Sequence, residues 1–94
     1  MAKAPKAPIP IAENLIRFGE NLRKIRESKN LGLREVATRC KIDHSDIAKY
    51  ERAEQNMTIL TLIEVSKGLD VHPKEILDFE IDWENKFSFP KVSE

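Results

Sequence analysis

The sequence predicts an all-α fold, a compact five-helix bundle with a C-terminal extension. Apolar side chains recur at steps of three and four residues through residues 11–79, the spacing of amphipathic helices, and no period-two strand pattern interrupts that region. A length of 94 residues, with 40% hydrophobic and 34% charged side chains, suits one small domain. We therefore expect a flexible, proline-rich arm over residues 1–10, a domain over residues 11–79 and a tail over residues 80–94.

The first element is a long helix from Ile11 to Lys29. Its apolar positions fall on one face and charged side chains fill the other. The apolar positions are Leu15, Phe18, Leu22 and Ile25. We expect this helix to lie across the two that follow.

Residues 33–52 predict two short helices joined by a tight polar turn. The first runs from Leu33 to about Cys40, with Gly32 as an acceptable N-cap and a small apolar stripe facing the core. The turn covers residues 41–43, the length found in DNA-binding helix-turn-helix units.

The second short helix begins after Asp43, an N-cap that is expected to accept a hydrogen bond from the Asp46 backbone N–H. Ile47 and Tyr50, three residues apart, face inward. The outward face carries His44, Ser45, Ala48, Lys49 and Arg52. Such a helix is suited to enter a DNA groove.

Two more helices complete the predicted bundle. Thr58 is an N-cap for a fourth helix, which closes near Gly68 as its C-terminal glycine. Its expected inward residues are Ile59, Leu62, Ile63 and Val65. Pro73 suits the first position of a short fifth helix. That helix carries Ile76, Leu77 and Phe79.

The tail alternates aromatic and aliphatic residues with acids, and this period of two suggests a strand or hairpin. Two interpretations stay open: a tail folded onto its own core, and a dimerisation element that buries its apolar side chains against a partner. The dimerisation candidates are Ile81, Trp83, Phe87 and Phe89.

The formal net charge is zero, but the charge is unevenly distributed. Residues 1–56 hold 12 Lys and Arg against 8 Asp and Glu, whereas residues 57–94 hold 4 against 8. This asymmetry would orient the protein on a polyanion. The single cysteine, Cys40, is compatible with a reducing cytoplasm, and neither a signal peptide nor a membrane span is expected.

Three segments in this order resemble the phage-repressor-like (Cro/C1-type) helix-turn-helix family: FGENLRKIRESKNL, EVATRCKIDHSDIAKYERAEQN and TILTLIEVSKGLDV. The resemblance covers residues 18–79. It implies a lambda-repressor-like bundle and a cytoplasmic transcriptional regulator that binds double-stranded operator DNA as a homodimer.

Carried over residue by residue, the resemblance places the base-reading positions on His44, Ser45 and Lys49. Their chemistry suits the major groove, because Lys49 can donate to guanine O6 and N7 while Ser45 can pair with several base edges. The His44 imidazole can donate to a base acceptor or to a phosphate.

Backbone contacts to DNA are expected from Arg52, Asn56 and Lys41, which would fix register without reading sequence. Arg26 and Glu51 match a pair that, in the family, bridges the first helix to the end of the recognition helix. We expect that pair to be structural.

Four positions depart from the family pattern. The first is Gly32, which stands where a Ser or Thr N-cap is common. Leu33 stands where a glutamine commonly touches the DNA backbone, and Lys41 replaces a turn glycine, so it must adopt an unfavourable conformation or the turn shifts. Asp46 places a carboxylate near the DNA-facing side. These changes bear on affinity more than on fold.

No enzyme activity, cofactor or metal site is expected. Cys40 and His44 are separated by a turn and His72 is distant, so no four-ligand set is visible. Neither a glycine-rich phosphate loop nor a Ser/His/Asp set is present.

Two function classes follow: a sequence-specific transcriptional regulator, and a protein-interaction module, antitoxin-like, that keeps the fold with weak or no DNA binding. Within the first, a phage repressor, a restriction-modification controller and an autoregulating antitoxin stay open. A protein partner such as RNA polymerase or a toxin is not identified by the sequence.

Overall fold

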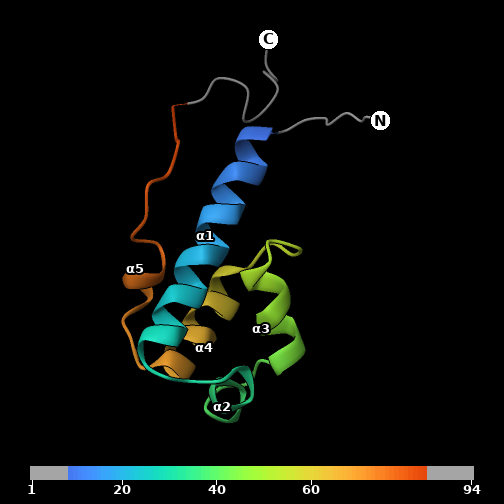
Figure 1. Ribbon diagram of the computed structural model, residues 1–94, viewed down its shortest axis with the longest axis vertical. Helices are drawn as coiled ribbons and strands as arrows, with labels where there is room; N and C mark the ends of the chain where they lie inside the picture. The colour runs from blue at the N-terminus through green and yellow to red at the C-terminus, as the bar shows by residue number, and fades with distance from the viewer. Residues whose placement is uncertain (1–8, 85–94) are drawn as a thin grey trace.

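The computed structural model describes residues 9–84, and within them it contains five α-helices and no strand. In chain order these are α1 (Ile9–Ser28), α2 (Leu33–Thr38), α3 (His44–Glu51), α4 (Ile59–Leu69) and α5 (Pro73–Ile76). The expected all-α bundle is confirmed. In Figure 1, α3 and α5 flank the long helix α1 on opposite sides, while α2 lies at its lower end.

The core is formed where α2 packs on α3 and α4 while α1 packs on α3 and α5. Among the described residues, the buried apolar side chains are Phe18, Leu22, Leu31, Val36, Ile47, Tyr50, Leu62, Val65, Leu69 and Ile76. Burying one such side chain fully contributes about 1.5–3 kcal/mol. All five helices contribute to this single cluster, which is why short helices such as α2 and α5 are held in place.

The crossing of α1 and α3 is unusually close at Gly19. A Cβ built on Gly19 would lie 2.5 Å from the Glu51 carbonyl oxygen and 2.7 Å from that of Tyr50. Only glycine fits there, because real Cβ atoms do not approach backbone oxygens so closely. The last turn of α3 is therefore fixed directly against the middle of α1.

Several helix boundaries differ from the prediction. Helix α5 ends at Ile76, so the prediction that it also carries Leu77 and Phe79 is wrong, because the backbone leaves the helix at Leu77. Helix α1 ends at Ser28, one residue before the expected Lys29. Helix α1 begins at Ile9, two residues earlier than expected, because a proline at position 10 is tolerated in a first helical turn. Helix α2 ends at Thr38, so Cys40 lies in the turn that follows. The Cys40 thiol donates there to the Val36 carbonyl at 3.4 Å.

Helix α4 ends near Gly68, as predicted, but the prediction that Gly68 is the glycine that closes it is wrong. The helix continues to Leu69, and Asp70 is the residue that turns into the left-handed region, with φ of 58°. Gly68 is buried inside α4, where a Cβ would lie 2.8 Å from Val36 Cγ1. Its role is close packing of α4 on α2 rather than chain reversal.

The inward face of α4 is narrower than predicted. Leu62 and Val65 are buried, as expected, but Ile59 is 66% exposed and Ile63 is 39% exposed. Ile59 lies at the rim of an open apolar groove of about 500 Å³ between the first turn of α4 and α1, so no core atoms cover it. The expectation that Ile59 and Ile63 face the core is therefore wrong.

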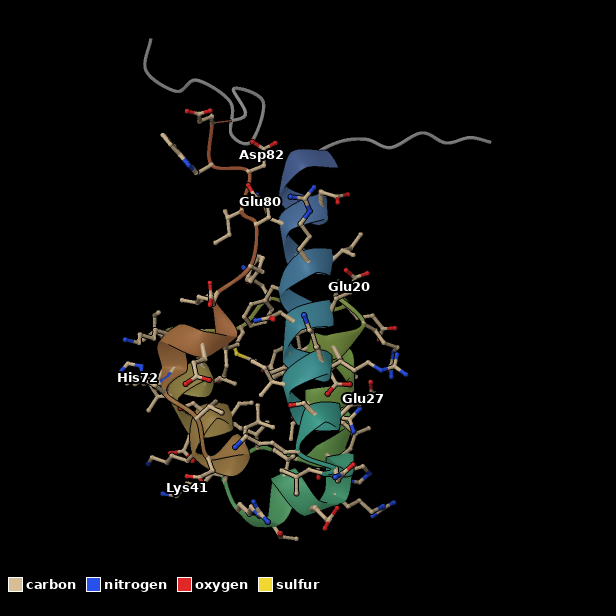
Figure 2. The ribbon with its side chains drawn as sticks, turned by 60° about the vertical axis from the view of Figure 1, so that its left-hand side comes forward. Glu20, Glu27, Lys41, His72, Glu80 and Asp82 are labelled. Atoms are coloured by element: carbon tan, nitrogen blue, oxygen red, sulfur yellow. The ribbon has the colours of Figure 1, made fainter. Side chains whose placement is uncertain are left out.

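The strand or hairpin expected in the tail is absent from its described part. Residues 80–84 are irregular and run beside α1 (Figure 2), where the Asn14 side chain bonds both backbone groups of Asp82 at 2.9 and 3.1 Å. Arg17 donates to the Glu80 carbonyl at 3.0 Å. These side chains satisfy backbone groups that a partner strand would otherwise bind. Phe87 and Phe89 lie outside the described residues.

Candidate nucleic-acid interface

Helix α3 presents one face to the core and the other to solvent. Ile47 and Tyr50 are buried, as predicted, with 1% and 7% exposure. The residues expected to read bases lie on the other side: Ser45 and Lys49 are exposed, and His44 is half-buried. All three lie in the first and second turns of α3 and none of them is buried in the core.

The start of α3 is capped differently from the prediction. Asp43 is the N-cap, but its Oδ2 accepts the backbone N–H of Ser45 at 3.0 Å and also the Ser45 hydroxyl. The Asp46 N–H, the expected partner, instead donates to the Asp43 backbone carbonyl at 3.1 Å. The pKa of Asp43 is lowered, chiefly by the Ser45 hydroxyl and then by the Ser45 N–H.

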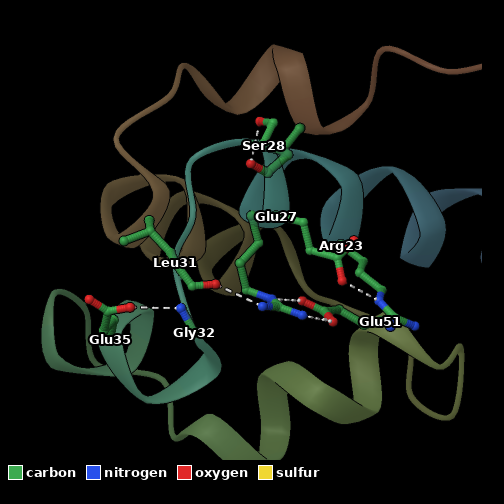
Figure 3. Close-up of polar contacts among 9 residues, drawn as sticks. Arg23, Glu27, Ser28, Leu31, Gly32, Glu35 and Glu51 are labelled. Carbon is green, nitrogen blue, oxygen red and sulfur yellow. Dashed lines mark hydrogen bonds and ion pairs between the residues drawn. The ribbon is translucent and has the colours of Figure 1, made fainter.

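The far end of α3 is held by an ion pair that joins three segments (Figure 3). Arg26 Nε and Nη2 donate to the two oxygens of Glu51 at 2.6 and 3.0 Å, and Arg26 Nη1 donates to the Leu31 carbonyl at 2.8 Å. The two side chains are only 12% and 6% exposed. The Glu51 carboxylate raises the pKa of Arg26, so the guanidinium stays charged. This arrangement fixes the recognition helix relative to α1.

Arg52, expected to hold the DNA backbone, is already occupied in the free protein. Its Nε and Nη2 donate to the two oxygens of Glu54 at 2.8 and 3.1 Å, and both side chains are exposed. The pKa of Glu54 is lowered by this bond first, and Lys49 adds a smaller effect. The sequence pattern did not indicate Glu54, because helical periodicity predicts contacts three or four residues apart, and Arg52 and Glu54 are two apart.

The two other expected backbone contacts lie in loops. Lys41 is exposed and its backbone N–H donates to Glu64 Oε1 on α4 at 3.2 Å. Lys41 has no positive φ, so the unfavourable conformation considered for it does not occur and the turn takes another path. Asn56 accepts the Met57 N–H at 2.9 Å through its side-chain oxygen. Neither position is buried.

One cation near the start of α3 was missed by sequence reasoning. Arg34 is exposed on α2, and after the Ser45 hydrogen bonds and the charge of His44 it also contributes to lowering the pKa of Asp43, the N-cap of α3. The sequence could have indicated this residue, because Arg34 directly follows Leu33, the position at which the family commonly contacts the DNA backbone. Arg34 can offset the negative charge of Asp43 beside a phosphate backbone.

An exposed apolar surface lies on another side of the bundle. Its residues, here named the α4–α5 apolar surface, are Ile59, Leu60, Ile63 and Leu77. Leu60 is the most exposed at 75%, and the groove described above adjoins it. Of the tail's dimerisation candidates, Ile81 is 40% exposed and Trp83 is 78% exposed. Exposed apolar side chains that gather on one helix, as Ile59, Leu60 and Ile63 do on α4, indicate an interaction surface.

Residues 9–84 were also compared with the requirements of metal sites and of membrane-spanning helices. No group of three or more His, Cys, Asp or Glu side chains there could hold a metal ion. None of the helices in the same range combines the length and apolar character that crossing a membrane requires.

Comparison with known proteins places these features in context. The family model described as helix-turn-helix matches residues 22–76. The control protein C.BamHI of Bacillus amyloliquefaciens is 36% identical over 63 residues, covering 66% of this chain and 78% of that protein. The restriction-modification controller protein C.AhdI from Aeromonas hydrophila superposes with a TM-score of 0.65 at 28% identity, covering 68% of this chain and 97% of that one.

A second controller structure was solved with DNA. The restriction-modification controller protein C.Esp1396I, a tetramer in complex with its natural 35 base-pair operator, matches with a TM-score of 0.60 and 30% identity. The match covers 68% of this chain and 95% of that one.

Proposed function

Because this chain belongs to the helix-turn-helix family, we propose that it is a DNA-binding transcriptional regulator that reads an operator through α3 as a homodimer. The observation that carries the proposal is the two-sided character of α3. Ile47 and Tyr50 are locked in the core, while Ser45 and Lys49 stand in solvent on the opposite side. A rigid helix with solvent-exposed polar side chains can enter the major groove without rearranging its backbone.

The proposed division of roles follows from side-chain chemistry. Lys49 donates to guanine O6 and N7, and His44 and Ser45 contact neighbouring base edges. Arg52, Lys41 and Asn56 hold the phosphate backbone, and Arg34 joins them. Because cationic side chains that bind phosphates release counterions, we expect the affinity for DNA to fall markedly as the salt concentration rises.

The relatives favour one regulatory setting among those that the sequence left open. Two of the matched structures are named as restriction-modification controllers, and C.BamHI is named as a control protein. We therefore propose that this chain controls transcription of restriction-modification genes. C.Esp1396I binds its 35 base-pair operator as a tetramer. We propose that the operator of this chain is likewise long enough to bind more than one dimer.

A homodimer would bring two copies of α3 to successive major grooves, about 34–36 Å apart. We propose that the α4–α5 apolar surface forms the centre of this dimer, because Ile59, Leu60 and Ile63 lie together on one exposed helix face. Ile81 and Trp83 extend the apolar area from the tail. We propose that Phe87 and Phe89, which lie outside the described residues, belong to the same interface.

Binding titrations across a range of salt concentrations test this proposal. We expect affinity for duplex DNA to fall steeply with salt, Arg52→Ala to shallow the slope by about one unit, and Lys49→Ala to cost about 1–3 kcal/mol at preferred sites only. Lys74→Ala, on exposed α5, is the control for charge alone. Binding that is indifferent to salt would favour the protein-interaction module instead.

A further inference from the structure

The Ser45 hydroxyl, at the start of α3, donates its hydrogen to another side chain of the protein. Ser45 Oγ donates to Asp43 Oδ2, and the same oxygen accepts the Ser45 backbone N–H at 3.0 Å. An ionised carboxylate has no hydrogen to give, so the hydroxyl must be the donor. The pKa of Asp43 lies below its ordinary 3.8, so this carboxyl group is ionised at neutral pH.

After the two Ser45 hydrogen bonds, two neighbouring side chains make smaller electrostatic contributions to lowering the pKa of Asp43. His44 Nδ1 lies 3.8 Å from Asp43 Oδ1, and both His44 and Arg34 contribute to lowering the pKa of the Asp43 carboxyl. Neither forms a hydrogen bond with Oδ2, the atom that Ser45 uses. Neither side chain therefore competes with Ser45 for this acceptor in the free protein.

With its hydrogen already used, Ser45 Oγ can only accept hydrogen bonds from DNA. A serine hydroxyl has one hydrogen and two lone pairs, and here the hydrogen is already used. The hydrogen-bond donors on base edges in the major groove are the amino groups of adenine N6 and cytosine N4. Guanine and thymine present O6, N7 and O4, which are acceptors and have nothing to offer an accepting hydroxyl.

We propose that the Asp43–Ser45 pair makes α3 select amino bases, adenine or cytosine, over keto bases, guanine or thymine, at the position that Ser45 faces. The inference rests on the DNA-reading function proposed above and adds the class of base read at one position. Ser45 is the contacting residue. Asp43 is a positioning residue, because it acts only by orienting the Ser45 hydroxyl.

The test is to select bound sequences from a random duplex pool with the wild type and three variants. Ser45→Ala identifies the position that Ser45 faces. Asp43→Asn keeps the N-cap, since asparagine caps as well as aspartate, but its neutral amide holds the hydroxyl hydrogen less strongly. Asp46→Asn is the matched control, because it removes a charge from the same helical turn and its carboxylate makes no hydrogen bond to Ser45 among the described residues.

The expected result is one motif position whose preference is lost in Ser45→Ala. At that position the wild type should favour adenine or cytosine about three- to tenfold, the value of one net hydrogen bond. Asp43→Asn should lower that ratio toward one, because the more weakly held hydroxyl can also donate to guanine or thymine, while Asp46→Asn should leave the ratio unchanged.

The proposal is overturned if the wild type prefers guanine or thymine there. It is also overturned if Asp43→Asn keeps the wild-type ratio, or if Ser45→Ala alters no position. These outcomes leave an enriched motif and therefore leave the regulator function standing. A pool in which no motif is enriched would instead remove the proposed function together with this inference.

Discussion

Arg26 of α1 and Glu51, the last residue of α3, form a doubly hydrogen-bonded ion pair that is almost closed to solvent, with Nε···Oε2 and Nη2···Oε1 distances of 2.6 and 3.0 Å. The third arm of the guanidinium binds the Leu31 carbonyl just before α2. One side chain thus links α1, α3 and the segment leading into α2. The orientation of the recognition helix depends on this link.

Replacing either partner of this pair should be costly. Glu51→Ala leaves the Arg26 charge buried without its partner, and we expect the free energy of unfolding to fall by about 3–5 kcal/mol. Arg23→Ala is the matched control, because Arg23 pairs with Glu27 at 3.0 Å on the exposed face of α1, where such pairs contribute about 0–1 kcal/mol. Urea unfolding measures both. Equal losses in the two variants would contradict the structural role of the buried pair.

Gly68→Ala should destabilise the protein even though alanine is the better helix former by about 1 kcal/mol. The new methyl group would lie 2.8 Å from Val36 Cγ1 and 2.9 Å from the Val36 carbonyl oxygen, so α2 and α4 must separate. We expect a loss of about 1–3 kcal/mol in urea unfolding. Gly32→Ser is the control, because the nearest atom to a Cβ there is 3.7 Å away and serine is a good N-cap. A stabilised Gly68→Ala variant would show that the helices are not so closely packed.

Glu54→Gln should tighten DNA binding. The Glu54 carboxylate occupies the donor edge of Arg52 with two hydrogen bonds, so a phosphate must displace it before Arg52 can bind. For an exposed pair we expect a gain of about two- to fivefold in affinity, measured by fluorescence anisotropy. Glu13→Gln is the matched control, because Glu13 pairs with Arg17 on α1 and the change in net charge is the same. The same gain in both variants would attribute the effect to net charge rather than to release of Arg52.

Leu60→Glu should convert the homodimer to a monomer. Leu60 is the most exposed member of the α4–α5 apolar surface, so a charge there costs nothing in the monomer fold but would be desolvated in the dimer. Ile16→Glu makes the same change at a 43% exposed position outside that surface, and it should stay dimeric. Sedimentation velocity distinguishes the two states. If Leu60→Glu stays dimeric while Trp83→Ala does not, the tail and not α4 holds the dimer.

The sequence predicted the parts of the fold that periodicity controls. Apolar spacing predicted where the helices lie. It also predicted correctly that Ile47 and Tyr50 are buried, because a short amphipathic helix can bury its apolar side chains on only one face. It could not predict that Ile59 would lie uncovered, since this depends on where α1 leaves a groove. For Gly68, composition alone cannot separate a helix end from a close helix contact.

The candidate site was predicted in its location and less well in its local contacts. The family resemblance placed His44, Ser45 and Lys49 on α3, and in the structure all three belong to α3, with Ser45 and Lys49 exposed and His44 half-buried. The Asp43 cap bonds Ser45 instead of Asp46, because two N-cap geometries are open to the same residue types. In the tail, the period of two was misleading because Asn14 of α1 supplies the hydrogen bonds that a strand would need.

The central claim is that two copies of α3 read a symmetric operator, and selection of bound duplexes by the wild-type protein tests it most directly. We expect an enriched inverted repeat whose half-site centres are separated by about 10–10.5 base pairs, one turn of DNA, or a multiple of it. Enrichment should fall in a parallel selection with Lys49→Ala. A pool that stays random under conditions where the protein is folded and dimeric would contradict the account.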